Sequence, residues 1–233
     1  MITIKLEENN LPYIEVHNEN GSKREFYTSH NELFELLMKN CVKEEKRRKD
    51  YSLPVFETPA LPPNTVKYMA LPDGKVLIAM EKKAFSHDIT YHATKFEAVP
   101  FPNLLFVFLF APGKDGYVLS DKKLYAFKDK VLRDTTKLYR FPFSHVTIDG
   151  SMCFFFLSQV KDLAQMTSFI YNWLSSGFTD HYYNGHGEGK NHFNMPLRQV
   201  FGHLQGKEFE FDKLVDDDKT VQSLMQSYAK LYY

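Results

Sequence analysis

In the first part of the 233-residue chain, hydrophobic residues first alternate with polar ones and then recur at helical spacing. Residues 1–28 alternate apolar and polar side chains in three short runs, and Asn20-Gly21 supplies a hairpin turn, so a small β-meander is predicted. Ser29 and Glu32 then match a capping box, which predicts that a helix comes next. The apolar positions at helical spacing are Leu33, Phe34, Leu37, Met38, Cys41 and Val42. We expect residues 1–50 to form a β-meander-plus-helix attachment in which Cys41 is a structural thiol.

Prolines and strand-like runs organise the middle of the chain. Four prolines within residues 51–65 and the lack of helical periodicity there predict an extended connector, followed by a domain over 66–233. Residues 66–128 read as strands joined by connections too short for crossovers, which predicts an antiparallel meander of about four to five strands. The run 104–110 is apolar throughout, which is typical of a central strand covered on both faces. The expected strand runs are 66–70, 75–80, 89–92, 95–99, 104–110, 117–119 and 123–127.

Helical patterns fill the C-terminal part, so the predicted fold class is α+β with flanking helices. One helix is expected after Ser158 as N-cap, with Gly177 closing it, and a short one over 197–204. A last helix is expected after Asp216 to Asp218 as its cap. Its predicted inner side is Val221, Leu224, Met225, Tyr228 and Leu231.

Composition narrows the partners that the chain can have. Lysine plus arginine equals aspartate plus glutamate at 29 each, so the whole-chain charge attracts neither nucleic acid nor membrane. The basic cluster Lys43 to Lys49 is read as a solvated helix end, with nucleic-acid contact as the alternative. Two cysteines favour free thiols in a reducing compartment. The first residues lack a signal-peptide pattern and the longest apolar run is far shorter than a membrane span, so we expect a cytoplasmic protein without membrane contact.

The stretch from His145 to Cys153 holds the candidate chemistry. Asp149-Gly150 marks a tight turn between the histidine and the cysteine, and Pro142 is expected to end strand pairing and expose the residues after it. A nucleophilic thiol needs a neighbour that favours the thiolate, and His145 is the nearest candidate in sequence. The alternative is a buried, structural Cys153, because the residues that come after it are apolar.

A histidine- and glycine-rich loop over 178–194 raises a metal hypothesis through His181, His186 and His192. Their spacings match no zinc signature, and the glycines do not follow a strand as a phosphate-binding loop requires. We expect a flexible polar surface loop, with substrate or partner contact and metal binding as alternatives. No metal and no cofactor is assigned.

The run His145-Val146-Thr147-Ile148-Asp149-Gly150-Ser151-Met152-Cys153 resembles the active-site flap of the ubiquitin-conjugating enzyme superfamily, which reads His-Pro-Asn-Val-x-x-x-Gly-x-[Ile/Val/Met]-Cys. Together with Leu61 to Val66 and Leu138 to Phe143, it is similar to prokaryotic ubiquitin-conjugating-like family D. Members of that family are encoded as protein B of the ParB-related, ThiF-related (PRTRC) cassette of bacterial plasmids and mobile elements. The resemblance covers roughly residues 55–180.

The resemblance implies a ubiquitin-conjugating-like fold in which Cys153 forms a thioester. The implied partners are a ThiF-like activating enzyme and a ubiquitin-like or sulfur-carrier-like protein. His145 stands where the family has the asparagine that stabilises an oxyanion, and Phe143 and Ser144 replace the preceding His-Pro, so the motif is degenerate. His145 would donate a hydrogen bond to the oxyanion or act as a base. The expected function is therefore a cysteine-dependent carrier or acyl transferase, and the alternative is a non-catalytic interaction module.

Overall fold

The computed structural model describes residues 2–6, 11–18, 21–41, 57–153 and 159–230. The chain forms two compact units, Met1–Glu57 and Thr58–Tyr233. The division falls inside the proline-rich segment 51–65. Most of that segment, the basic cluster Lys43 to Lys49, and Phe154 to Ser158 lie outside the described residues.

The N-terminal unit contains a three-stranded antiparallel sheet in the order β1-β2-β3 and one helix. The strands are β1 (Ile2–Lys5), β2 (Tyr13–His17) and β3 (Lys23–Tyr27), and the helix is α1 (His30–Cys41). The predicted capping box is confirmed, because Ser29 Oγ accepts from the Glu32 N–H at 3.1 Å and the Glu32 carboxylate accepts from the Ser29 N–H at 3.2 Å. Leu33 is buried, whereas Phe34 is exposed, so the predicted apolar face is wrong at Phe34. The side chain of Cys41 lies outside the described residues.

The C-terminal unit is built on a seven-stranded sheet in the order β12-β10-β9-β8-β5-β4, with β11 paired to β9, and all these pairings are antiparallel. Its strands are β4 (Thr65–Ala70), β5 (Val76–Lys82), β8 (Asn103–Gly113), β9 (Gly116–Phe127), β10 (Lys137–Arg140), β11 (Gln159–Val160) and β12 (Asp216–Thr220). All residues of β8 from Asn103 to Phe110 are buried, which confirms the predicted central strand covered on both faces. The fold is a mixed, mostly antiparallel α+β fold.

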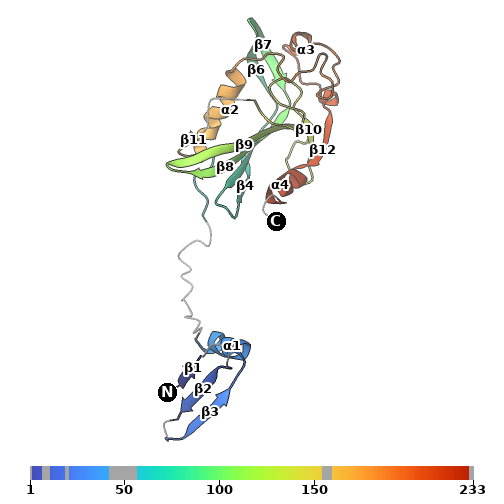
Figure 1. The fold of residues 1–233 in the computed structure, drawn as a ribbon. Helices are drawn as coiled ribbons and strands as arrows, with labels where there is room; N and C mark the ends of the chain where they lie inside the picture. The colour runs from blue at the N-terminus through green and yellow to red at the C-terminus, as the bar shows by residue number, and fades with distance from the viewer. Residues whose placement is uncertain (1, 7–10, 19–20, 42–56, 154–158, 231–233) are drawn as a thin grey trace. The chain divides into compact units, whose positions relative to one another are not determined.

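Helices cover both faces of this sheet (Figure 1). On one face, α2 (Met166–Ser175), α3 (Leu197–Leu204) and the hairpin of β6 (Phe85–Tyr91) and β7 (Thr94–Phe101) enclose an aromatic core. On the other face, α4 (Val221–Lys230) buries Val221, Leu224, Met225 and Tyr228 against β5, β8 and β9, as predicted. Two short 3₁₀ turns, Leu163–Gln165 and Phe211–Lys213, complete the described elements. Leu231 and Ser158 lie outside the described residues.

The predicted meander is wrong in its strand membership. The runs 89–92 and 95–99 do not join the main sheet but form the separate β6–β7 hairpin. Ile89, Phe96 and Val99 of this hairpin are buried in the aromatic core, so it packs on the sheet rather than extending it. The runs 117–119 and 123–127 are one continuous strand, β9, because its pairing with β8 continues past a single register shift.

The predicted helix cap at Asp216 to Asp218 is also wrong, because these residues lie in β12. Asp217 is buried between the side chains of Arg140 and Lys219, with N–O distances of 3.4 and 2.6 Å. These two cations neutralise the buried carboxylate, so the acidic strand β12 can pair within the sheet. The start of α4 is capped instead by Thr220, whose Oγ1 accepts from the Ser223 N–H at 3.1 Å.

Candidate active site

Residues 146–152 form a tight antiparallel hairpin. Val146 pairs with Met152, the Thr147 N–H donates to the Ser151 carbonyl at 2.9 Å, and the Gly150 N–H donates to the Thr147 carbonyl at 3.1 Å. Gly150 has a φ of +88°, and a Cβ there would lie 2.6 Å from the Tyr125 ring. The position therefore needs glycine for its backbone conformation and for the close approach to Tyr125.

The hairpin lies along β9. The Met152 N–H donates to the Lys122 carbonyl at 3.0 Å, and the Leu124 N–H donates to the Gly150 carbonyl at 2.9 Å. Tyr125 adds a hydroxyl bond to the Asp149 carbonyl at 2.9 Å. Since β9 is an interior strand of the sheet, these bonds give the hairpin a rigid base.

The Asp149 carboxylate organises the turn. It accepts from Lys123 Nζ at 2.5 Å, from Ser151 Oγ at 2.9 Å and from Thr147 Oγ1. Partial burial acts to raise the pKa of Asp149, but the hydrogen bonds from Lys123, Thr147 and Ser151 outweigh it and hold that pKa well below its usual range. Asp149 is therefore an ionised structural group of the turn, and the carboxylate is not available as an acid catalyst at neutral pH.

Cys153 comes directly after the hairpin as a free, partly exposed thiol. Its backbone N–H donates to the His145 carbonyl at 2.8 Å, which ties the two ends of the hairpin together. The phenylalanines after Cys153 lie outside the described residues, so the choice between a nucleophilic and a structural thiol stays a prediction.

His145 lies in the left-handed region, with a φ of +65°, and its ring is half-buried against Phe178. Its Nε2 accepts from the backbone N–H of Thr179 at 3.1 Å, and Thr179 Oγ1 lies 3.0 Å from the same nitrogen. Burial lowers the pKa of His145, and the nearby charges of His181 and Lys190 lower it further. The ring is therefore neutral with its proton on Nδ1, which suits a hydrogen-bond donor and leaves no free lone pair for a base.

Two buried polar residues near this hairpin were not found from the sequence. Lys190 is 1% exposed, and its Nζ donates to the carbonyls of Phe143 and Val146. Asn191 is 3% exposed and donates to the Pro142 carbonyl at 2.7 Å. These contacts hold the segment after β10. The predicted exposure of the residues after Pro142 is therefore wrong for Phe143 and Ser144, which are buried.

The histidine-rich loop is therefore more than a polar surface loop. His181, His186 and His192 are exposed, but Lys190, Asn191, Tyr183 and Phe193 of the same loop are buried. No group of three or more metal-ligating side chains occurs among the residues that the structure describes. The loop binds the segment beside the candidate site through Lys190 and Asn191, and among the described residues its histidines do not form a metal-ligating group.

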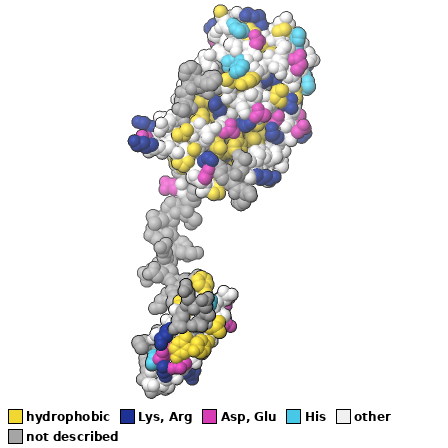
Figure 2. All heavy atoms as spheres, in the orientation of Figure 1, with side chains coloured by type: hydrophobic (Ala, Val, Ile, Leu, Met, Phe, Trp, Pro, Cys, Tyr) yellow, Lys and Arg dark blue, Asp and Glu magenta, His cyan; other side chains and the backbone are white. Residues whose placement is uncertain are grey.

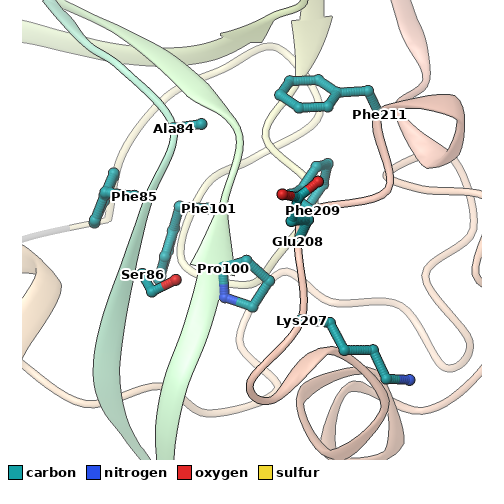
Figure 3. Close-up of a pocket in the computed structure, with 9 residues that line it drawn as sticks. All are labelled: Ala84, Phe85, Ser86, Pro100, Phe101, Lys207, Glu208, Phe209 and Phe211. Atoms are coloured by element: carbon teal, nitrogen blue, oxygen red, sulfur yellow. The ribbon is translucent and has the colours of Figure 1, made fainter.

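Two cavities among the described residues are lined by residues other than Cys153. One, of about 350 Å³, is lined by Phe85 and Phe101 of the β6–β7 hairpin and by Phe209 and Phe211 of the C-terminal segment (Figure 3). On the face shown in Figure 2, basic and acidic side chains of the C-terminal unit are interspersed, so no single-sign field covers that face. No helix in the described part of the chain is long and apolar enough to cross a membrane.

Comparison with protein-family models, with curated proteins and with solved structures gives no match for this chain.

Proposed function

We propose that the chain is a cysteine-dependent carrier of the ubiquitin-conjugating type, which accepts the C-terminus of a ubiquitin-like or sulfur-carrier-like protein as a thioester on Cys153. The observation that carries the proposal is the partly exposed Cys153 thiol, held by its backbone to His145 at the end of a hairpin in register with the flap motif. The order of elements supports it: an antiparallel meander, then the hairpin, then the cysteine, then α2.

The first step would be transfer from a ThiF-like activating enzyme. The Cys153 thiolate attacks the carbonyl carbon of the activator-bound thioester, forming a new C–S bond. The C–S bond to the activator breaks, and the activator thiolate leaves and takes up a proton from solvent. No net oxidation occurs.

The second step would be attack on the Cys153 thioester by an amine. The C–N bond forms through a tetrahedral oxyanion, the C–S bond breaks with the electron pair leaving on the Cys153 thiolate, and the amine releases its proton to solvent. In this proposal the Nδ1–H of His145 donates a hydrogen bond to the oxyanion. One such donor is worth about 3–4 kcal/mol of barrier. Because the ring nitrogen that could accept a proton already accepts from Thr179, His145 would not serve as the base.

The contacts between His145 and Thr179 also favour a second candidate, a non-catalytic interaction module. A ring fixed to Thr179 and a motif without the family's asparagine fit a fold kept as a binding surface. In that case Cys153 would form no thioester, and the trapping experiment separates the two candidates.

The test is to incubate the protein with a ThiF-like activating enzyme, Mg-ATP and the small modifier, and to look for an adduct that reducing thiols release. The carrier proposal expects the adduct in the wild type and in Cys41→Ala, its loss in Cys153→Ala, and a thiol-resistant, hydroxide-sensitive oxyester in Cys153→Ser. An adduct that persists in Cys153→Ala would overturn the carrier proposal. No adduct in the wild type, with the activator shown to be loaded, would favour the interaction module.

A further inference from the structure

Lys190 is a buried lysine with no acidic partner among the described residues. It is 1% exposed, and its ammonium donates to two backbone carbonyls, to that of Phe143 at 3.1 Å and to that of Val146. Burial lowers the pKa of Lys190 to about 8, and the charge of Arg140 acts in the same direction. A buried charge without a counter-ion destabilises the fold unless hydrogen bonds compensate for its lost hydration, so these two carbonyl contacts are needed to keep Lys190 inside.

The two carbonyls that Lys190 binds lie on either side of the His145 bend. His145 has a φ of +65°, a conformation that a non-glycine residue keeps only when its surroundings hold it. Between the two clamped carbonyls, the His145 carbonyl accepts the backbone N–H of Cys153 at 2.8 Å. One amine therefore fixes both ends of the turn on which the candidate nucleophile is held.

Asn191, the neighbour of Lys190, binds the carbonyl one residue before Phe143. Its amide donates to the Pro142 carbonyl at 2.7 Å, and its Oδ1 accepts from the Phe193 N–H at 3.0 Å. The loop thus binds three carbonyls between Pro142 and Val146 with two adjacent side chains. A residue that only filled the core would need none of these donors, since a methionine has similar volume and no desolvation penalty.

We propose that Lys190 is a positioning residue of the candidate active site, whose buried amine clamps the Phe143 and Val146 carbonyls and so fixes His145 and the backbone of Cys153. Only the expected effect of Lys190 on thioester formation depends on the proposed function. The clamp itself is a property of the folded chain and can be measured without a modifier.

The experiment compares Lys190→Met, which removes every donor, with Lys190→Gln, which keeps an N–H donor. Lys114→Met, at the exposed turn between β8 and β9, is the matched control. Amide hydrogen exchange and the titration of the His145 ring are followed by NMR. Thioester formation on Cys153 is measured alongside.

In Lys190→Met, the amide of Cys153 should exchange about fivefold faster or more, as expected for loss of one net hydrogen bond, while amides of β8 keep their protection. The pKa of His145 should rise, because one of the two charges that face it, Lys190 and His181, is gone. Thioester formation should slow by about tenfold or more. In amide exchange and thioester formation, Lys190→Gln should fall between the wild type and Lys190→Met, because it keeps an N–H donor. The pKa of His145 should rise as it does in Lys190→Met, because both variants lack the charge. Lys114→Met should match the wild type.

Unchanged Cys153 exchange and an unchanged His145 titration in a folded Lys190→Met would overturn the proposal. Failure of both variants to fold would overturn it as well, because the lysine would then serve the whole fold. If the wild type forms no thioester, the carrier function fails, while exchange and titration still decide the role of Lys190.

Discussion

The backbone N–H of Cys153 donates to the carbonyl of His145 at 2.8 Å. The candidate nucleophile and the candidate oxyanion donor are therefore fixed to each other through the main chain, whatever their side chains do. The hairpin between them is bound to β9 on one side, and the segment before it is bound to the loop of Lys190 on the other. Substitutions that disturb these backbone contacts should affect chemistry at Cys153 although the thiol itself is unchanged.

Gly150→Ala should destabilise the protein by about 2–4 kcal/mol. The new methyl group would lie 2.6 Å from the Tyr125 ring, and the φ of +88° disfavours any side chain. Urea unfolding measures the change in free energy. Gly206→Ala is the control, because its φ is +71° but nothing lies within 4 Å, so it should cost only about 1 kcal/mol. Equal losses in both variants would show that contact with Tyr125 does not matter.

Replacing His145 should separate loading of Cys153 from discharge. His145→Gly removes the ring and tolerates the φ of +65°, so thioester formation should persist while discharge to an amine slows about 10²–10³-fold. His145→Asn introduces the asparagine of the ubiquitin-conjugating flap that this hairpin resembles in sequence, and asparagine also accepts this backbone conformation. Single-turnover discharge of the preformed thioester measures both rates. Discharge in His145→Gly as fast as in the wild type would exclude the ring as an oxyanion donor.

Local signals in the sequence predicted those parts of the structure that depend on neighbouring residues. The capping box at Ser29, the buried run 104–110 and the helix over 197–204 are all fixed by short-range pattern and burial. The turn at Gly150 belongs to the same class, because a tight turn is encoded in a few adjacent residues.

The remaining parts depend on contacts far apart in sequence. Lys190 lies 44 residues after Val146, and a lysine in a polar loop carries no local sign that it will be buried. Thr179, 34 residues after His145, decides the tautomer of the ring, and neither residue type reveals that pairing. The hairpin of β6 and β7 has strand-like alternation whichever sheet it joins, so its departure from the meander is set by packing on the aromatic core.

Asp149→Asn should weaken the hairpin turn by about 0.5–1 kcal/mol at pH 7, a small effect because the carboxylate is largely exposed and screened. Since the folded state depresses the pKa of Asp149, its contribution is present above the unfolded value of 3.8 and is lost as pH falls below it. Urea midpoints at pH 7 and pH 3 should therefore differ less in the variant than in the wild type. Asp115→Asn, in the exposed β8–β9 turn, should leave the difference unchanged.

The neutral state of His145 makes stability depend on pH in a defined direction. The folded chain holds the pKa of His145 below 6.5, so at mildly acidic pH the unfolded chain binds more protons and stability falls as pH falls. The contribution is complete above about pH 6.5 and is lost on acidification. His145→Gln removes the titration, and its amide oxygen can still accept from the Thr179 N–H.

Urea unfolding at pH 7.5 and pH 5.5 tests this linkage. The wild type should lose more stability between the two pH values than His145→Gln does. His181→Gln is the control, because His181 is exposed and its ring centroid lies 6.0 Å from that of His145. Since burial is the main cause of the lowered pKa of His145, the His181 variant should keep most of the wild-type slope. Equal slopes in the wild type and His145→Gln would mean that the ring is not kept neutral by the fold, and the donor role of its Nδ1–H would lose its basis.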